Sequence, residues 1–441
     1  MAGTIILPSW LITSGKELPR RNWGVRVQGG SITDVAPTEK LVQDYPQDRA
    51  IHAENQVLSP GFVNTHTHLY GVLAHGIPLD RAPSGFWPFL ADFWWPRVED
   101  RLDHEMIRAA TDWQCLAMTQ SGVTSFYDCL EAPNSIPGSL EVEAEIVEKY
   151  GLRAILSFEA TERISIDNGL LGLQENYNFT SRRHSRGGMI QGMMCFHTTF
   201  TCSEEFIQRA CRMANKLGCQ MHMHVSEGMY EPDRMLEKNQ MRTMEFYDHI
   251  GVLSSNTLAS QCVQINDNEI GLIAERDVHV SHMPLSNCEV GGGIAPIPQL
   301  CATGVTVGLG SDGYIDNFFA VMRGAFLIHK ANQRDPRLMP ASLVFYLATE
   351  GGARTLNLEK VGRIGAGWKA DLQLIDANFP TPAADWNLYD QLILYRDPQH
   401  VRMVMVDGRI VLENGRSKTG RESVAHEALW EESLRLWGKT P

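Results

Sequence analysis

The chain has 441 residues, 43% of them hydrophobic and 21% charged, proportions that are ordinary for a globular enzyme. Its formal net charge of −13 argues against a nucleic-acid partner or an anionic membrane partner, because both require a basic face. No segment reaches about 18 uninterrupted apolar residues, so we expect no membrane span.

The nine cysteines also bear on the compartment. They are an odd number and contain no CxxC pair, which favours free thiols in a reducing environment over disulfides. The N-terminal residues show no basic segment followed by a long apolar one, so no secretory signal is evident. We therefore expect a cytoplasmic protein.

The predicted elements change character along the chain. The first 57 or so residues favour short strands and turns, such as 24–27 and 31–35 on either side of the Gly29-Gly30 turn. From Val57 onward, apolar β-branched runs alternate with helical segments. The strand candidates are 61–65, 124–127, 153–158, 192–196, 220–224, 257–262, 278–282 and 305–309, and helical candidates between them are 104–120, 140–150, 203–217, 267–276 and 317–330. Eight strands alternating with helices predict an α/β fold, a closed (β/α)8 barrel of the TIM type.

Strand and turn patterns return after about residue 363. Residues 371–376 favour a strand, and 401–406 and 409–413 favour a hairpin around the Asp407-Gly408 turn. An amphipathic helix is expected at 423–437. We predict that both chain ends, 1–57 and 364–441, build one small composite domain of the β-sandwich type around a barrel of residues 58–363.

His66 and His68 end the first barrel strand candidate. Residues i and i+2 of a strand share a face, so both imidazoles can point to one place. At the C-terminal end of a barrel strand, that place is the usual active site. The pattern HxH taken alone is more often a packing or surface feature.

His224 and Glu227 end the fifth strand candidate. They offer a nitrogen ligand and, just beyond the strand, a carboxylate, whereas a zinc-type site needs three or four N or O ligands and a position for water. A nearby carboxylate that is not a ligand can then move the proton. His222 alternates with His224 and is either a residue that supports the site or a core histidine.

Asp312 follows the eighth strand candidate in the glycine-rich segment 308–313. The glycines let this loop approach its neighbours closely. An isolated match would more often be a left-handed turn with a helix cap. Here Asp312 follows the strand at which a metal-bound aspartate is expected. Its position in the series of barrel strands, rather than its residue type, is therefore the evidence for a role as a metal ligand.

These motifs resemble a known family over nearly the whole chain. The segments that carry the resemblance are SPGFVNTHTH (59–68), HVSE (224–227), HMPLSN (282–287), GSD (310–312) and GAGWKADL (365–372). They are similar to the amidohydrolase superfamily, in its branch of cytosine deaminases, guanine deaminases and triazine hydrolases (chlorohydrolases). Trp94-Trp95, 138–140 and FEATER (158–163) are most similar to SsnA-like aminohydrolases.

The resemblance implies roles for individual residues. It implies one divalent metal ion, Zn²⁺ or alternatively Fe²⁺, with ligands at His66, His68, His224 and Asp312. It implies that Glu227 is the proton shuttle. In the mechanism that we hypothesise, Asp312 is also catalytic and accepts the proton of the attacking water. His197 matches a position that contacts substrate, and His282 matches one near the mouth of the site.

Gln261 departs from the family pattern. The sixth strand usually carries a histidine in the setting LxAHC, but this chain reads LASQC at 258–262. An amide can orient a ligand through hydrogen bonds, but it cannot carry a proton near neutral pH. Three alternatives follow: Glu227 and Asp312 carry out every proton transfer, or the reaction differs, or activity is lost. Alternatively, Gln261 only satisfies buried partners.

The expected substrate is a small nitrogen heterocycle, deaminated by hydrolysis at an amidine-like ring carbon. The alternatives are hydrolysis of another C–N, C–Cl or C–S bond of such a ring, and a metal-binding scaffold without activity. The aromatic segment 86–95, with Trp87, could stack on a flat ring as a lid and bind substrate. It could equally be a core helix or an oligomer interface, and we expect a homo-oligomer, a dimer or larger.

Overall fold

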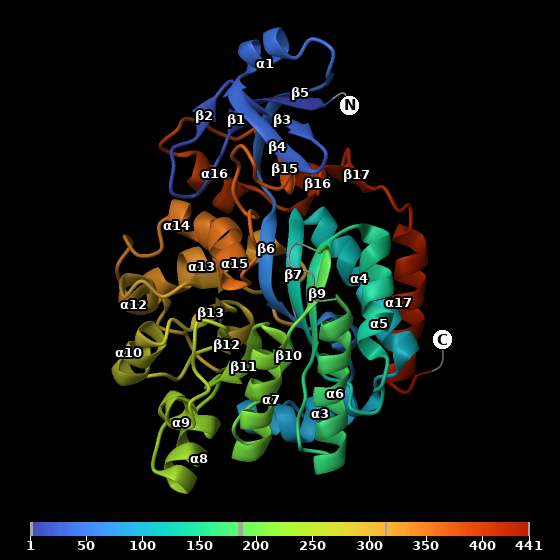
Figure 1. Ribbon diagram of the computed structural model, residues 1–441, viewed down its shortest axis with the longest axis vertical. Coiled ribbons are helices and arrows are strands. Elements are labelled where there is room, and N and C mark those ends of the chain that lie inside the picture. Colours follow the sequence, from blue (N-terminus) through green and yellow to red (C-terminus); the bar gives the residue numbers. More distant parts are fainter. Residues whose placement is uncertain (1–2, 184–187, 314, 440–441) are drawn as a thin grey trace.

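A closed parallel barrel forms the centre of the molecule (Figure 1). The computed structural model describes residues 3–183, 188–313 and 315–439. The barrel strands are β6 (Phe62–Thr67), β7 (Val123–Leu130), β8 (Arg153–Phe158), β9 (Ile190–Gly192), β10 (Met194–Cys195), β11 (Met221–Val225), β12 (Thr257–Gln261), β13 (His279–His282) and β14 (Val307–Leu309). They form the sheets β6-β7-β8-β9 and β10-β11-β12-β13-β14. Bridges from Thr67 to Asp312 and from Ala160 to Phe196 join the two sheets, so the barrel closes.

The fourth barrel strand differs from its prediction. The expected strand 192–196 is divided into β9, which pairs with β8, and β10, which pairs with β11. Met193 lies between the two pieces and is buried. Two short strands therefore fill the fourth barrel position, and each pairs with one of the neighbouring barrel strands.

Helices follow the barrel strands along the chain and surround the barrel, as the alternation of strand and helix patterns in the sequence predicts. They are α4 (His104–Gln120), α5 (Ser139–Tyr150), α6 (Ile166–Arg183), α7 (Glu204–Leu217), α8 (Tyr230–Asn239), α9 (Thr243–His249), α10 (Asp267–Glu275), α11 (Ser286–Glu289), α12 (Ile297–Ala302), α13 (Phe318–Gln333), α14 (Ala341–Tyr346) and α15 (Gly352–Thr355). Local signals set their ends: Asp103 accepts hydrogen bonds from two N–H groups of α4, and Gly151 ends α5 in the left-handed region at φ 67°. In α7, Phe206, Ile207 and Ala210 bury one face.

Both chain ends build the small β domain, at the top of Figure 1. Its strands are β1 (Thr4–Leu11), β2 (Arg20–Arg21), β3 (Trp23–Gln28), β4 (Ser31–Pro37), β5 (Arg49–Pro60), β15 (Leu372–Asp376), β16 (Val401–Val406), β17 (Arg409–Glu413) and β18 (Arg416–Ser417), with helices α1 (Thr38–Asp44) and α16 (Leu388–Tyr395). They form one nine-stranded sheet in which β5 pairs with β15. Ile6, Val25, Leu372 and Met403 share one buried cluster, so the two halves have a common core.

Two features tie the small domain and the C-terminus to the barrel. Arg153 Nε of β8 donates to Asp371 Oδ2 at 2.9 Å, and both side chains are almost fully buried. Helix α17 (Glu422–Leu436) runs beside α4 (Figure 1). Trp437 Nε1 donates to Leu73 O at 2.8 Å.

The predicted fold class is confirmed: a TIM-like barrel carries a β-rich domain made from both chain ends. Within the described residues, no helix has the length and apolar character needed to cross a membrane.

Candidate metal centre

His66 and His68 lie at the C-terminal end of β6, as the strand pattern predicts. Their rings are 4.8 Å apart between centroids and perpendicular. His68 Nδ1 donates to the carbonyl oxygen of Cys129 at 2.6 Å, which leaves Nε2 free to act as a ligand. His66 is fully buried, and its two ring nitrogens have no hydrogen-bond partner among the described residues.

His224 reaches the same place from the end of β11. Its ring centroid lies 4.9 Å from that of His66. Its Nδ1 lies 2.7 Å from Oε1 of Glu159, the residue after β8, so Nε2 is left for a ligand role. Burial opposes charge on both partners, yet the Glu159 carboxylate raises the pKa of His224 to about 10. Conversely, His224 and His197 hold the pKa of the buried Glu159 below its ordinary value.

Asp312 enters from the end of β14, where the backbone makes a tight turn. A side chain at Gly310 would meet the carbonyl oxygen of His66 at 2.9 Å, so this approach needs glycine. Asp312 itself adopts φ 60°, in the left-handed region. Its Oδ1 accepts from the N–H of Gly313 at 2.9 Å and lies 3.6 Å from His68 Nε2.

The geometry of these side chains fits a divalent metal ion. Ligand atoms of His66, His68 and Asp312 lie within 4.8 Å of one another, and so do those of His66, His222 and His224. Two imidazole nitrogens buried without a partner, as in His66, cost free energy unless something binds them. Imidazole nitrogens and carboxylate oxygens are the donors of mononuclear zinc sites. The donor set and its unpartnered nitrogens therefore fit a divalent cation.

A small cavity of about 50 Å³ opens beside this centre. His68, His224, Gln261, Asp312 and Glu227 contribute to its wall. Burial, followed by the nearby Asp312 carboxylate, raises the pKa of Glu227 to about 8. A carboxyl group with such a pKa carries a proton at neutral pH, as a general acid requires.

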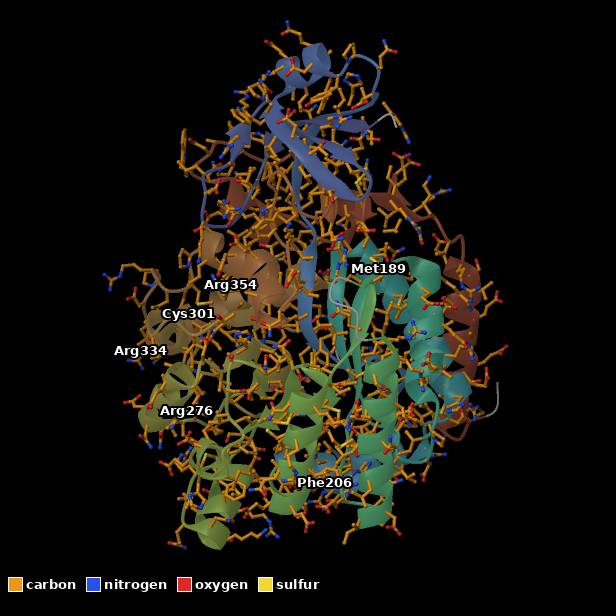
Figure 2. The ribbon with its side chains drawn as sticks, viewed as in Figure 1. Met189, Phe206, Arg276, Cys301, Arg334 and Arg354 are labelled. Carbon is orange, nitrogen blue, oxygen red and sulfur yellow. The ribbon has the colours of Figure 1, made fainter. Side chains whose placement is uncertain are left out.

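Aromatic side chains close the cavity at the end of the barrel away from the small domain, where Figure 1 labels α3. This aromatic cover consists of Phe86, Phe89 and Trp94, with Leu90 beside them, from α2 (Phe86–Pro88) and a π-helix (Phe89–Trp94) that continues into α3 (Trp95–Arg97). A larger cavity, of about 520 Å³, lies elsewhere, at the strand ends that face the small domain. Figure 2 labels Arg354 on its wall.

The other residues expected to bind substrate take different places. His197 lines the cavity, and its Nδ1 lies 2.9 Å from Thr201 Oγ1. Trp87 stacks on Tyr230 with centroids 4.1 Å apart and does not line the cavity. His282 is fully buried, and its Nε2 lies 3.1 Å from His329 Nε2, so it also stays outside that wall.

Acidic residues of the site escaped the sequence prediction. Glu159 contacts His224, and its position after the third barrel strand was the available signal. Glu231 accepts from Thr199 Oγ1 at 2.6 Å and from the N–H of Ser226 at 2.6 Å, which ties two strand-end loops together. Glu99 lines the cavity and accepts a hydrogen bond from Tyr70. No short motif marks Glu231 or Glu99.

Fold and donor set together define a class, the metal-dependent hydrolases built on a (β/α)8 barrel. Residues 57–411 match the model of the amidohydrolase family, and the chain belongs to that family. The predictions of this family, of a metal-dependent hydrolase and of a divalent metal cofactor are confirmed.

Relatives and solved structures are similar over the whole chain. The 5'-deoxyadenosine deaminase of Methanothermobacter thermautotrophicus is 32% identical over 427 residues, 95% of this chain and 96% of that protein. The 5-methylthioadenosine/S-adenosylhomocysteine deaminase of Pelotomaculum thermopropionicum is 31% identical, with 94% of each chain covered. A zinc-bound adenosine deaminase from Xanthomonas campestris has a TM-score of 0.89 at 22% identity, covering 99% of this chain and 98% of its own. A zinc complex of an atrazine chlorohydrolase from Arthrobacter aurescens has a TM-score of 0.85 at 19% identity, covering 98% and 100%. At these identities, the two structures share the fold.

Proposed function

We propose that this protein deaminates an aminopurine ring of a nucleoside-like substrate by hydrolysis, with one Zn²⁺ ion as its cofactor. The observation that carries the proposal is the meeting of Glu227, His68, His224 and Asp312 on one cavity, with the unpartnered imidazole of His66 next to His68 and Asp312. The full-length similarity to deaminases of adenosine derivatives supports the substrate class. Iron remains the alternative ion for the same donors.

The proposed ligands are His66, His68, His224 and Asp312. A divalent ion held there would lower the pKa of a water molecule from 15.7 to about 7 and so would supply hydroxide at physiological pH. Asp312 orients that water and accepts its proton. Glu227 donates a proton to a ring nitrogen, which makes the adjacent amidine carbon electrophilic. The water oxygen would then bond to that carbon, and Asp312 would pass its proton to the amino group as the C–N bond breaks and ammonia leaves. The new hydroxyl group would return a proton to Glu227 as it becomes the carbonyl of the product.

The aromatic cover bears on the kind of substrate. A cavity of about 50 Å³ holds a few water molecules, whereas ligand sites for drug-sized molecules measure about 300–1,000 Å³. A nucleoside-sized substrate therefore requires the aromatic cover to shift outward. Once the cover closes again, Phe86 and Phe89 can lie against a flat ring and exclude water from it.

An ammonia-release panel tests the function. Zinc-loaded protein is incubated with 5'-deoxyadenosine, 5'-methylthioadenosine, S-adenosylhomocysteine, aminopyrimidines, pterins and aminotriazines. We expect ammonia and the matching oxo-purine from an adenosine derivative, and no reaction after removal of the metal by a chelator. Absence of ammonia from every adenosine derivative, with the metal bound, would overturn the proposal. Chloride release from a chlorotriazine would instead favour C–Cl hydrolysis.

A further inference from the structure

Gln261 has both ends of its amide engaged at the end of β12. Its Nε2 donates to Asp312 Oδ2 at 2.9 Å, and its Oε1 accepts a hydrogen bond from Asn287 Nδ2. Gln261 and Asn287 are each 1% exposed. The backbone of Gln261 adopts φ 73°, a conformation that residues other than glycine adopt only when the surrounding structure holds them there.

The charge of Asp312 fixes the direction of this chain of hydrogen bonds. A carboxylate only accepts hydrogen bonds, so Gln261 must turn its NH₂ group toward Asp312. The oxygen of Gln261 then faces away, and only a donor can satisfy it, so Asn287 must present its own NH₂ group. Each amide therefore has one orientation compatible with an ionised Asp312.

Asn287 is itself held firmly from the backbone. It belongs to α11, and its N–H donates to Met283 O at 3.2 Å. Its carbonyl oxygen accepts from the N–H of Gly292 at 2.9 Å. A side chain at Gly292 would meet the carbonyl oxygen of Glu227 at 2.5 Å, so the loop that carries Asn287 packs directly against the Glu227 backbone.

We propose that Asn287 and Gln261 form an amide relay that positions the Asp312 carboxylate for metal binding, in place of the usual sixth-strand histidine. Asn287 is a positioning residue that acts on Asp312 through Gln261. Because neither amide titrates, the relay keeps its hydrogen-bond direction over the pH range in which a histidine changes its charge. The proposal rests on the proposed role of Asp312 as a metal ligand, and it is independent of the substrate.

Metal affinity of the metal-free protein tests the relay without any turnover. The dissociation constant for Zn²⁺ is measured by competition with a chromophoric chelator for the parent, Asn287→Ala, Gln261→Ala and the double variant. We expect each single variant to bind zinc about 10- to 100-fold more weakly, the usual effect of removing a group that orients a ligand. In the Gln261→Ala background, Asn287→Ala should change the affinity by less than about twofold, because its route to Asp312 is already gone.

Two further variants separate the relay from general damage to the fold. Ser286→Ala removes a neighbouring buried hydroxyl that has no hydrogen-bond partner among the described residues, and zinc affinity should stay within about twofold of the parent. Asn287→Asp keeps the size of the side chain but replaces the donor by an acceptor, so Gln261 must turn its oxygen toward Asp312. We expect this variant to bind zinc at least as weakly as Asn287→Ala. Circular dichroism and thermal unfolding of each metal-free variant verify that it is folded.

The outcomes distinguish the relay from the proposed function. Weakened zinc binding with full coupling between Asn287 and Gln261 supports the relay, whatever the ammonia-release panel shows. Zinc affinity of Asn287→Ala or Asn287→Asp equal to that of the parent would overturn it, even if the protein deaminates adenosine derivatives. Multiplying effects in the double variant would also overturn it, because they would mean that the two amides act separately.

Discussion

Replacing Glu227 by glutamine keeps the size of the side chain but removes the carboxyl group that can donate a proton. Burial and Asp312 raise the pKa of Glu227 from 4.5 to about 8. At pH 7 a carboxyl group with a pKa of 4.5 is about 0.3% protonated, and one with a pKa of about 8 is about 90% protonated. In the metal-free protein, burial and the Asp312 carboxylate therefore favour the proton-donating form of Glu227 at pH 7.

We expect Glu227→Gln to lower kcat/KM about 10²- to 10⁴-fold, which is about 3–5 kcal/mol in the activation barrier. The parent should lose activity as the pH rises through about 8, because the acid form is the donor and its raised pKa keeps it protonated below that pH. The variant should lack this alkaline limb.

The assay is ammonia release from the best adenosine derivative across pH 5–10, with the metal content of each sample measured. Glu237→Gln, at an exposed position of α8, is the matched control and should keep parental activity. Our reasoning fails if Glu227→Gln, with metal bound, stays within about threefold of the parent. It also fails if the alkaline limb persists in the variant.

Three further substitutions test other parts of the structure. Glu159→Gln removes the carboxylate 2.7 Å from His224 Nδ1, and chelator competition should show about 10- to 100-fold weaker metal binding; parental affinity would contradict this role. Arg153→Ala leaves the buried Asp371 without its charged partner, and denaturant titration should show a loss of about 3–5 kcal/mol in the free energy of unfolding; a loss below about 1 kcal/mol would show that the pair is dispensable. Phe86→Ala removes one ring of the aromatic cover and should raise KM about 2- to 10-fold while metal affinity stays unchanged; an unchanged KM would exclude contact with substrate.

Local sequence patterns predicted the elements that bring the main side chains together. Residues 153–158, 401–406 and 409–413 form strands with the predicted bounds, because alternation and turn residues are local properties. The spacing of His66 and His68 placed both rings at one strand end for the same reason. Asp312 followed from its place in the series of barrel strands.

Contacts between distant residues could not be predicted in this way. Gln261 appeared as an unexplained departure because its partners, Asn287 and Asp312, lie 26 and 51 residues further along the chain. His282 looked like a residue of the mouth, but packing of α13 against β13 supplies His329 as its neighbour. Which side chain faces which depends on closure of the barrel and on the packing of its helices, and single motifs do not contain that information.

The pairing of β5 with β15 has a consequence for synthesis of the chain. Gln373 Nε2 donates to the carbonyl oxygen of Pro60 across 313 residues of sequence. At about 5–20 residues per second, a ribosome needs roughly 15–60 s to make that intervening segment. During this time the edge of β5 has no strand to pair with and is open to other chains. The nascent N-terminal sheet must therefore survive until the barrel has been made, so the small domain is begun first and completed late.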